Sequence, residues 1–188
     1  MRDYQRQYPE FSLCGLNCGL CPRYHADGVS GCPGCGGEGF FKKRPACGVI
    51  SCARRHGEIE YCYLCAEYPC KKYDNADATD SFISQINQRK DMEKAKRLGI
   101  DGYRAELDEK VRILRDLLGS YNDGRHKSFF CVAVNLLELS DIKSVMERLA
   151  VETTTDNTVK EKSAAAVRLF ECMADRRNMS LKLRKKEK

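Results

Sequence analysis

The sequence predicts a mostly α-helical protein in which a small, loop-rich cysteine module packs on a helical domain of about five helices. Ten of the twelve cysteines, all five prolines and ten of the fourteen glycines lie in the first seventy residues. The chain beyond Pro69 contains no proline, which favours uninterrupted helix. Apolar residues there recur at helical spacing. We therefore expect a metal-binding module (1–74), a helical domain (75–178) and a basic tail (179–188).

Five helices are expected in the second part, each from an apolar stripe or from its capping residues. Tyr103, Leu107, Val111, Leu114 and Leu118 form the clearest stripe, which Gly119 closes. The segment SFFCVAVNLLEL is apolar nearly all round, which predicts a central, buried helix. The expected helices are 79–99, with Thr79 or Asp80 as its cap, 103–119, 128–139, a short helix from Ser140 to Leu149, and about 158–178.

Whether the cysteines form disulfides or bind metal depends on the cellular compartment of the protein. No stretch approaches the ~20 apolar residues of a membrane span. The opening residues MRDYQRQYPEF contain no apolar run that could serve in secretion. We therefore expect a cytoplasmic protein, and in that compartment a dense cysteine set indicates metal rather than disulfides.

The net charge of +6 is concentrated at the C-terminus. The last seven residues, Lys182 to Lys188, carry five Lys or Arg and one Glu, hence +4 of the total. Residues 1–74 carry +2, and two Zn²⁺ held by eight thiolates would bring them to −2. An acidic module is a poor partner for phosphate, so any nucleic-acid binding is expected only weakly and through the basic tail.

Ten cysteines are candidate metal ligands, spaced as short chelating pairs such as Cys62-x2-Cys65. Zinc prefers four thiolate or imidazole ligands in tetrahedral geometry, and such pairs bring two thiolates to one ion. The sequence therefore predicts two Zn²⁺ in the module. The candidate ligands are Cys14, Cys18, Cys21, Cys32, Cys35, Cys47, Cys52, Cys62, Cys65 and Cys70.

The grouping of these ligands stays open. One assignment joins two of the first three cysteines to Cys32 and Cys35, and groups Cys47 with Cys52, Cys62 and Cys65. An interleaved cross-brace is the alternative. His25 and His56 each follow a cysteine by four residues, but a lone histidine is more often solvated, so both are left out. Four cysteines also hold iron–sulfur clusters, which remain the alternative cofactor.

The cysteine string and the helical half together resemble a known family. The segments CGLNCGLCPRY (14–24), GCPGC (31–35) and YCYLCAEYPCKKY (61–73) resemble the prokaryotic cysteine-rich family catalogued as domain of unknown function thirty-seven ninety-five. The helical segments YNDGRHKSFFCVAVNLLEL and MSLKLRKK also resemble its members. The family is often described as zinc-binding, so the resemblance implies a zinc site but no activity.

One thiol outside the module has basic neighbours. Arg125 and His126 precede the helix expected from Ser128, and Cys131 lies in its first turn, where a helix N-terminus lowers a thiol pKa. Cys131, Arg125 and His126 are therefore candidate catalytic residues, although a free cysteine is more often a buried small apolar side chain.

Three functions follow from these observations. The leading hypothesis is a zinc-binding scaffold for a macromolecular partner, such as an unknown protein, or for a small anionic ligand. The alternatives are a thiol enzyme that uses Cys131 at the junction of the two parts, and an iron–sulfur redox protein. Whether the protein is an enzyme is left open by the sequence.

Overall fold

The computed structural model describes residues 4–43, 46–74 and 79–185, and its regular structure there is helical, with no strand. The prediction of a mostly α fold with a loop-rich N-terminal part is confirmed. The described residues form seven α-helices: α1 (Phe40–Lys43), α2 (Gly48–Arg55), α3 (Gln88–Leu98), α4 (Ile100–Ser120), α5 (Lys127–Leu136), α6 (Leu139–Glu152) and α7 (Val159–Arg176). None of them is long and apolar enough to cross a membrane.

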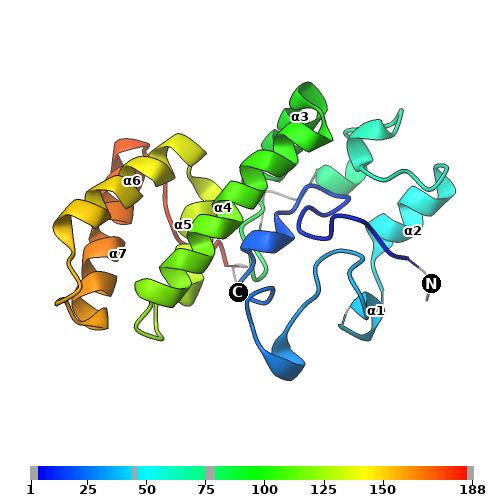
Figure 1. Cartoon of the computed structure of the whole chain (residues 1–188). Coiled ribbons are helices and arrows are strands. Elements are labelled where there is room, and N and C mark those ends of the chain that lie inside the picture. The colour runs from blue at the N-terminus through cyan, green and yellow to red at the C-terminus, as the bar shows by residue number, and fades with distance from the viewer. Residues whose placement is uncertain (1–3, 44–45, 75–78, 186–188) are drawn as a thin grey trace.

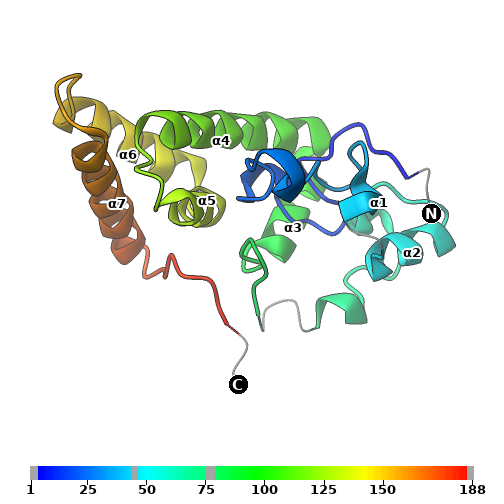
Figure 2. The same cartoon turned by 90° about the horizontal axis from the view of Figure 1, so that it is seen from below.

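Helix α4 connects the two parts of the molecule. Helices α5, α6 and α7 gather at one end of α4, and the cysteine-rich segment with α1 and α2 lies at the other (Figures 1 and 2). The predicted stripe faces the core: Tyr103, Leu107, Val111 and Leu114 are buried. These apolar residues form one face along the length of α4, so the cysteine-rich segment can pack on one end of that face and helices α5 to α7 on the other.

The cysteine-rich segment shares the main core. Phe11 is fully buried, and its ring centroid lies 4.5 Å from that of Tyr103 on α4 and 5.6 Å from that of Tyr61. A smaller cluster, formed by Leu13, Cys35, Phe40, Ile50 and Ala53, lies within the cysteine-rich segment itself. Residues 75–78, where the boundary between the two predicted parts falls, lie outside the described residues, and the division into domains stays a prediction.

The first predicted helix of the second half begins later than expected. Helix α3 starts at Gln88, and the preceding segment 79–87 is not helical. Asp80 does not cap a helix: its buried carboxylate accepts hydrogen bonds from the backbone N–H of Arg184 (2.8 Å) and from its guanidinium (2.7 Å). Figure 2 shows the C-terminal segment leaving α7, and these charge-assisted bonds join that segment to Asp80. They satisfy a carboxylate that burial would otherwise penalise.

Other boundaries differ by a few residues. Helix α5 ends at Leu136 rather than at residue 139, and α6 then begins at Leu139. The start of α7 agrees with the prediction, because Thr158 and Glu161 form a capping box. Residues 186–188 of the predicted basic tail lie outside the described residues.

A buried polar network lies at the junction of the cysteine-rich segment with the helices. The Asn17 amide donates to Asp91 Oδ2 (2.8 Å) on α3 and to Asn135 Oδ1 (3.2 Å) on α5. The Tyr103 hydroxyl on α4 donates to Asn17 Oδ1 (2.8 Å). One side chain between two cysteines is thus bonded to three helices, and all four residues are buried.

Asp91 makes the network sensitive to pH. Burial raises the pKa of Asp91 to about 6, although the positive charge of Lys110 opposes the shift. The folded-state pKa lies above the unfolded value of about 4. Protonation of Asp91 therefore adds to the free energy of unfolding at low pH, and this contribution is lost as the pH rises through 6. Wild type should therefore lose on the order of 2 kcal/mol of unfolding free energy relative to Asp91→Asn between pH 4 and 7.

Chemical denaturation of both proteins across this range measures the difference. The exposed Asp116, which accepts a hydrogen bond from Ser120 on its own helix, supplies the control substitution Asp116→Asn. Parallel pH profiles for wild type and Asp91→Asn would show that the Asp91 carboxyl is not titrating in this range.

Candidate metal centre

Tight turns hold the cysteine pairs. The backbone N–H of Cys21 donates to the carbonyl of Cys18 (3.0 Å), and that of Cys65 donates to Cys62 in the same way (3.0 Å). Each bond closes a single 3₁₀ turn, Cys18–Leu20 or Cys62–Leu64, with a cysteine at either end. Gly34, between Cys32 and Cys35, has φ +80°, and a Cβ there would lie 2.4 Å from the Pro9 carbonyl oxygen. The chain therefore needs glycine to pass this point.

The first cluster comprises Cys14, Cys18, Cys35 and Cys47, and charges on its thiols affect the pKa values of others in the cluster. Burial raises the pKa of Cys18 well above its ordinary value, and the charges that Cys35 and Cys14 would carry raise it further. Burial and Cys14 likewise raise the pKa of Cys35 to about 11, and Cys47 contributes in the same direction. Because such effects weaken with distance, they indicate that these thiols share one buried part of the segment.

Backbone and side-chain donors are directed at these sulfurs. The N–H of Leu13 and the N–H of Cys35 form hydrogen bonds that lower the pKa of Cys35 and of Cys18 respectively, against the larger effect of burial. The Ser12 hydroxyl lies 3.1 Å from Cys14 Sγ. Hydrogen bonds of this kind stabilise a thiolate more than a thiol.

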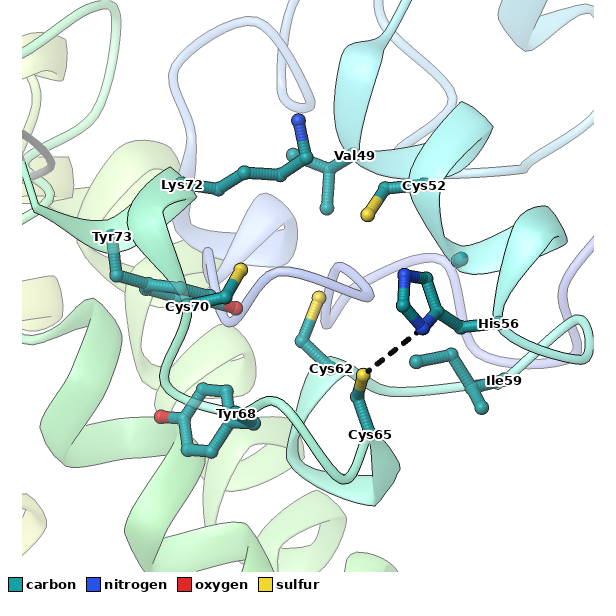
Figure 3. A pocket seen from close by; sticks show the side chains of 11 residues that line it. Val49, Cys52, His56, Ile59, Cys62, Cys65, Tyr68, Cys70, Lys72 and Tyr73 are labelled. Carbon is teal, nitrogen blue, oxygen red and sulfur yellow. Dashed lines mark hydrogen bonds between the residues drawn. The ribbon is translucent and has the colours of Figure 1, made fainter.

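The second cluster surrounds a cavity of about 20 Å³. Its sulfur and nitrogen groups come from α2 and the residue that follows it, from the turn Cys62–Leu64 and from the irregular segment after that turn, and Figure 3 shows them around the cavity. His56 Nδ1 lies 3.7 Å from Cys65 Sγ. The donors that line the cavity are Cys52, His56, Cys62, Cys65 and Cys70.

Tyr73 links the two clusters. Its hydroxyl donates to the carbonyl of Cys14 (3.1 Å) in the first cluster, and the same hydroxyl lies close enough to Cys62 in the second to affect its pKa. Burial raises the pKa of Cys62 to about 12, and the Tyr73 hydrogen bond partly opposes this. Among the residues that the structure describes, no three His, Cys, Asp or Glu side chains are placed so that they could hold a metal ion without moving.

The observed grouping differs from the assignment made from the sequence. Cys47 contributes to the raised pKa of Cys35 and is not among the residues that line the cavity, whereas Cys70 lines it. Cys21 lies toward the helical half, where its charge would raise the pKa of Cys131. Which cysteines share a metal stays a prediction, because spacing along the chain does not determine which turns meet in space.

The two histidines of the segment have different surroundings. His25 Nε2 lies 2.7 Å from the Gly19 carbonyl oxygen, and burial lowers its pKa. His56, which the sequence analysis left out, lines the second cavity. The sequence does show that His56 follows Cys52 by four residues. This spacing places the two side chains on the same side only if the segment is helical, and α2 was not predicted.

Cys131 has the environment of a core side chain. It is 1% exposed, and burial raises its pKa to about 12. The neighbouring basic groups have other partners: the Arg125 guanidinium bonds Asp123 Oδ2 (2.7 Å), and His126 Nδ1 lies 2.9 Å from Asp123 Oδ1. This burial favours the interpretation of Cys131 as an inert structural thiol, since reactive cysteines are partly exposed and have a pKa below that of an ordinary thiol.

The comparisons with known proteins find a similarity, and it lies in the cysteine-rich segment. No curated protein and no solved structure matches the chain. Residues 10–75, which contain all ten cysteines of the predicted module, match the family model described as Protein of unknown function (DUF3795). The match confirms the resemblance seen in the cysteine string: over residues 10–75, this chain is similar to the DUF3795 family.

Proposed function

We propose that residues 14–70 bind two Zn²⁺ and that the metal holds this segment folded against the helical half as a scaffold. The observation that carries the proposal is the cavity of about 20 Å³ lined by Cys52, Cys62, Cys65 and Cys70. A water molecule needs roughly 10–15 Å³ of such volume, so the cavity has room for a single ion of smaller radius and for little else.

The chemistry of the donors also fits zinc. Soft thiolates and imidazole are the ligands of structural zinc sites. Burial and neighbouring thiols raise the pKa values of Cys18 and Cys35 in the first cluster and of Cys62 in the second. A divalent cation at their centre would supply the missing positive charge and hold them as thiolates.

The scaffold role follows from the position of the clusters. They lie in a segment with little regular structure, and Tyr8, Phe11, Leu20 and Tyr61 anchor that segment in the main core. A bound metal would fix the loops between these anchors and so shape one side of the molecule. We propose that this surface, with the helical half, receives a macromolecular partner or a small anionic ligand.

Elemental analysis of protein purified without oxygen tests the metal. We expect about two zinc ions per chain and a colourless protein, as four-ligand zinc sites predict. Cys172→Ser, on α7 and outside both clusters, should keep the full content. Stoichiometric iron with a brown colour would favour the iron–sulfur alternative, and protein free of any metal would refute the proposal.

A further inference from the structure

We propose that His56 is a ligand of the second metal, which it binds together with Cys52, Cys62 and Cys65. This inference rests on the proposed metal-binding function and deepens it, because it replaces an all-cysteine site by one with three sulfurs and one nitrogen. Cys47 then belongs to the first cluster, with Cys14, Cys18 and Cys35. Each cluster thus has four donors.

Helix α2 places Cys52 and His56 on the same side. The backbone N–H of His56 donates to the Cys52 carbonyl (3.2 Å), so the two residues lie one helical turn apart. Residues four apart on a helix face the same way. Figure 3 shows both side chains directed from α2 into the cavity, toward Cys62 and Cys65.

The opposite wall is the Cys62-x2-Cys65 turn, whose backbone bond of 3.0 Å keeps both cysteines on one side. His56 Nδ1 lies 3.7 Å from Cys65 Sγ. Zinc bonds of ~2.3 Å to sulfur and ~2.0–2.1 Å to nitrogen, at a tetrahedral angle, place two such ligands about 3.6 Å apart. The observed separation therefore suits a shared ion.

Coordination through Nδ1 requires the neutral imidazole with its proton on Nε2. Three thiolates and one neutral imidazole leave the zinc site with one negative charge, whereas four thiolates would leave two. Cys70, which also lines the cavity, is then a neighbour of the site rather than one of its ligands.

X-ray absorption at the zinc edge of the loaded protein tests the proposal directly. Averaged over both ions, wild type should show about one nitrogen neighbour to seven sulfurs, as the two ligand sets predict. His56→Ala should lose the nitrogen and release one of its two zinc ions to a chromogenic chelator at least tenfold faster. His25→Ala is the matched control, because it removes the other histidine of the segment, and it should keep both the nitrogen and the slow release.

The outcomes separate the two proposals. Wild type that binds no metal refutes the proposed function itself. Wild type that binds two zinc ions through sulfur alone overturns the role of His56 and leaves the function standing. A nitrogen shell that persists in His56→Ala also overturns it. The wild-type spectrum decides whether a nitrogen ligand is present, and loss of that nitrogen in His25→Ala would assign it to His25 and overturn the proposal. Neither result depends on the folding of His56→Ala.

Discussion

Removing the metal with a strong chelator is expected to unfold most of the cysteine-rich segment and to leave most of the helical signal. Within that segment α1 has four residues and α2 has eight, too few to be stable alone in water. Its own apolar cluster contains five buried residues, one of them Cys35. Such a core buries too little surface to offset the entropy of ordering the loops.

The binding free energy of structural zinc is therefore folding free energy here, and its loss should cost several kcal/mol. Hydrogen exchange with and without chelator measures the effect by segment. We expect amides of α1, α2 and the loops around Cys32 and Cys62 to lose protection. Those near Phe11 and Leu20 should be affected less, because both side chains are fully buried in the main core.

Readdition of zinc should restore the protection, which distinguishes metal loss from damage by the chelator. Exchange profiles and thermal melts that coincide for loaded and stripped protein would contradict this prediction. They would mean that the contacts of Phe11 and Tyr61 with α4 suffice to hold the whole segment.

The helical half was the more predictable part of the fold. The stripe of α4 depends on spacing within a single helix, and the cap of α7 depends on two residues three apart. Both signals are local, so the sequence contains them in full. The predicted start of α3 was wrong for the opposite reason. Asp80 bonds Arg184, a residue 104 positions away, and no local sequence pattern predicts that pairing.

The cysteines of the candidate site stand out in the sequence, but their arrangement in space does not. The ten cysteines were recognised from spacing, and the structure gathers several of them into two clusters. Their grouping depends on how α2 packs beside the Cys62–Leu64 turn. Helix α2 itself was missed because it has only eight residues, which is too short for an apolar stripe to repeat along the sequence.

The role of Asn17 had no signal in the sequence. In the sequence Asn17 is one of three residues between Cys14 and Cys18, yet its side chain joins the cysteine-rich segment to α3, α4 and α5. A buried polar contact of this kind is defined by the partners that surround it, and these lie 74 to 118 residues away.

Replacing Asn17 by alanine is therefore expected to destabilise the protein strongly, by about 3–5 kcal/mol. The substitution removes one donor and one acceptor group. It leaves the Asp91 carboxylate, the Asn135 amide oxygen and the Tyr103 hydroxyl without their bonds to Asn17, and all three residues are buried. An unsatisfied buried group costs roughly 1–3 kcal/mol, and more when it is charged.

Denaturant unfolding of the metal-loaded protein measures this loss, and Asn157→Ala is the matched control. Asn157 accepts a hydrogen bond from the backbone N–H of Thr154 (2.7 Å) in the α6–α7 connection, where water can replace it, so its loss should cost about 1 kcal/mol or less. Because Asn17 stands at the junction, its variant should also separate the chelator-sensitive segment from the helices at lower denaturant. Equal stability of the two variants would mean that water satisfies the junction groups, and that the cysteine-rich segment is held to the helices by apolar contacts alone.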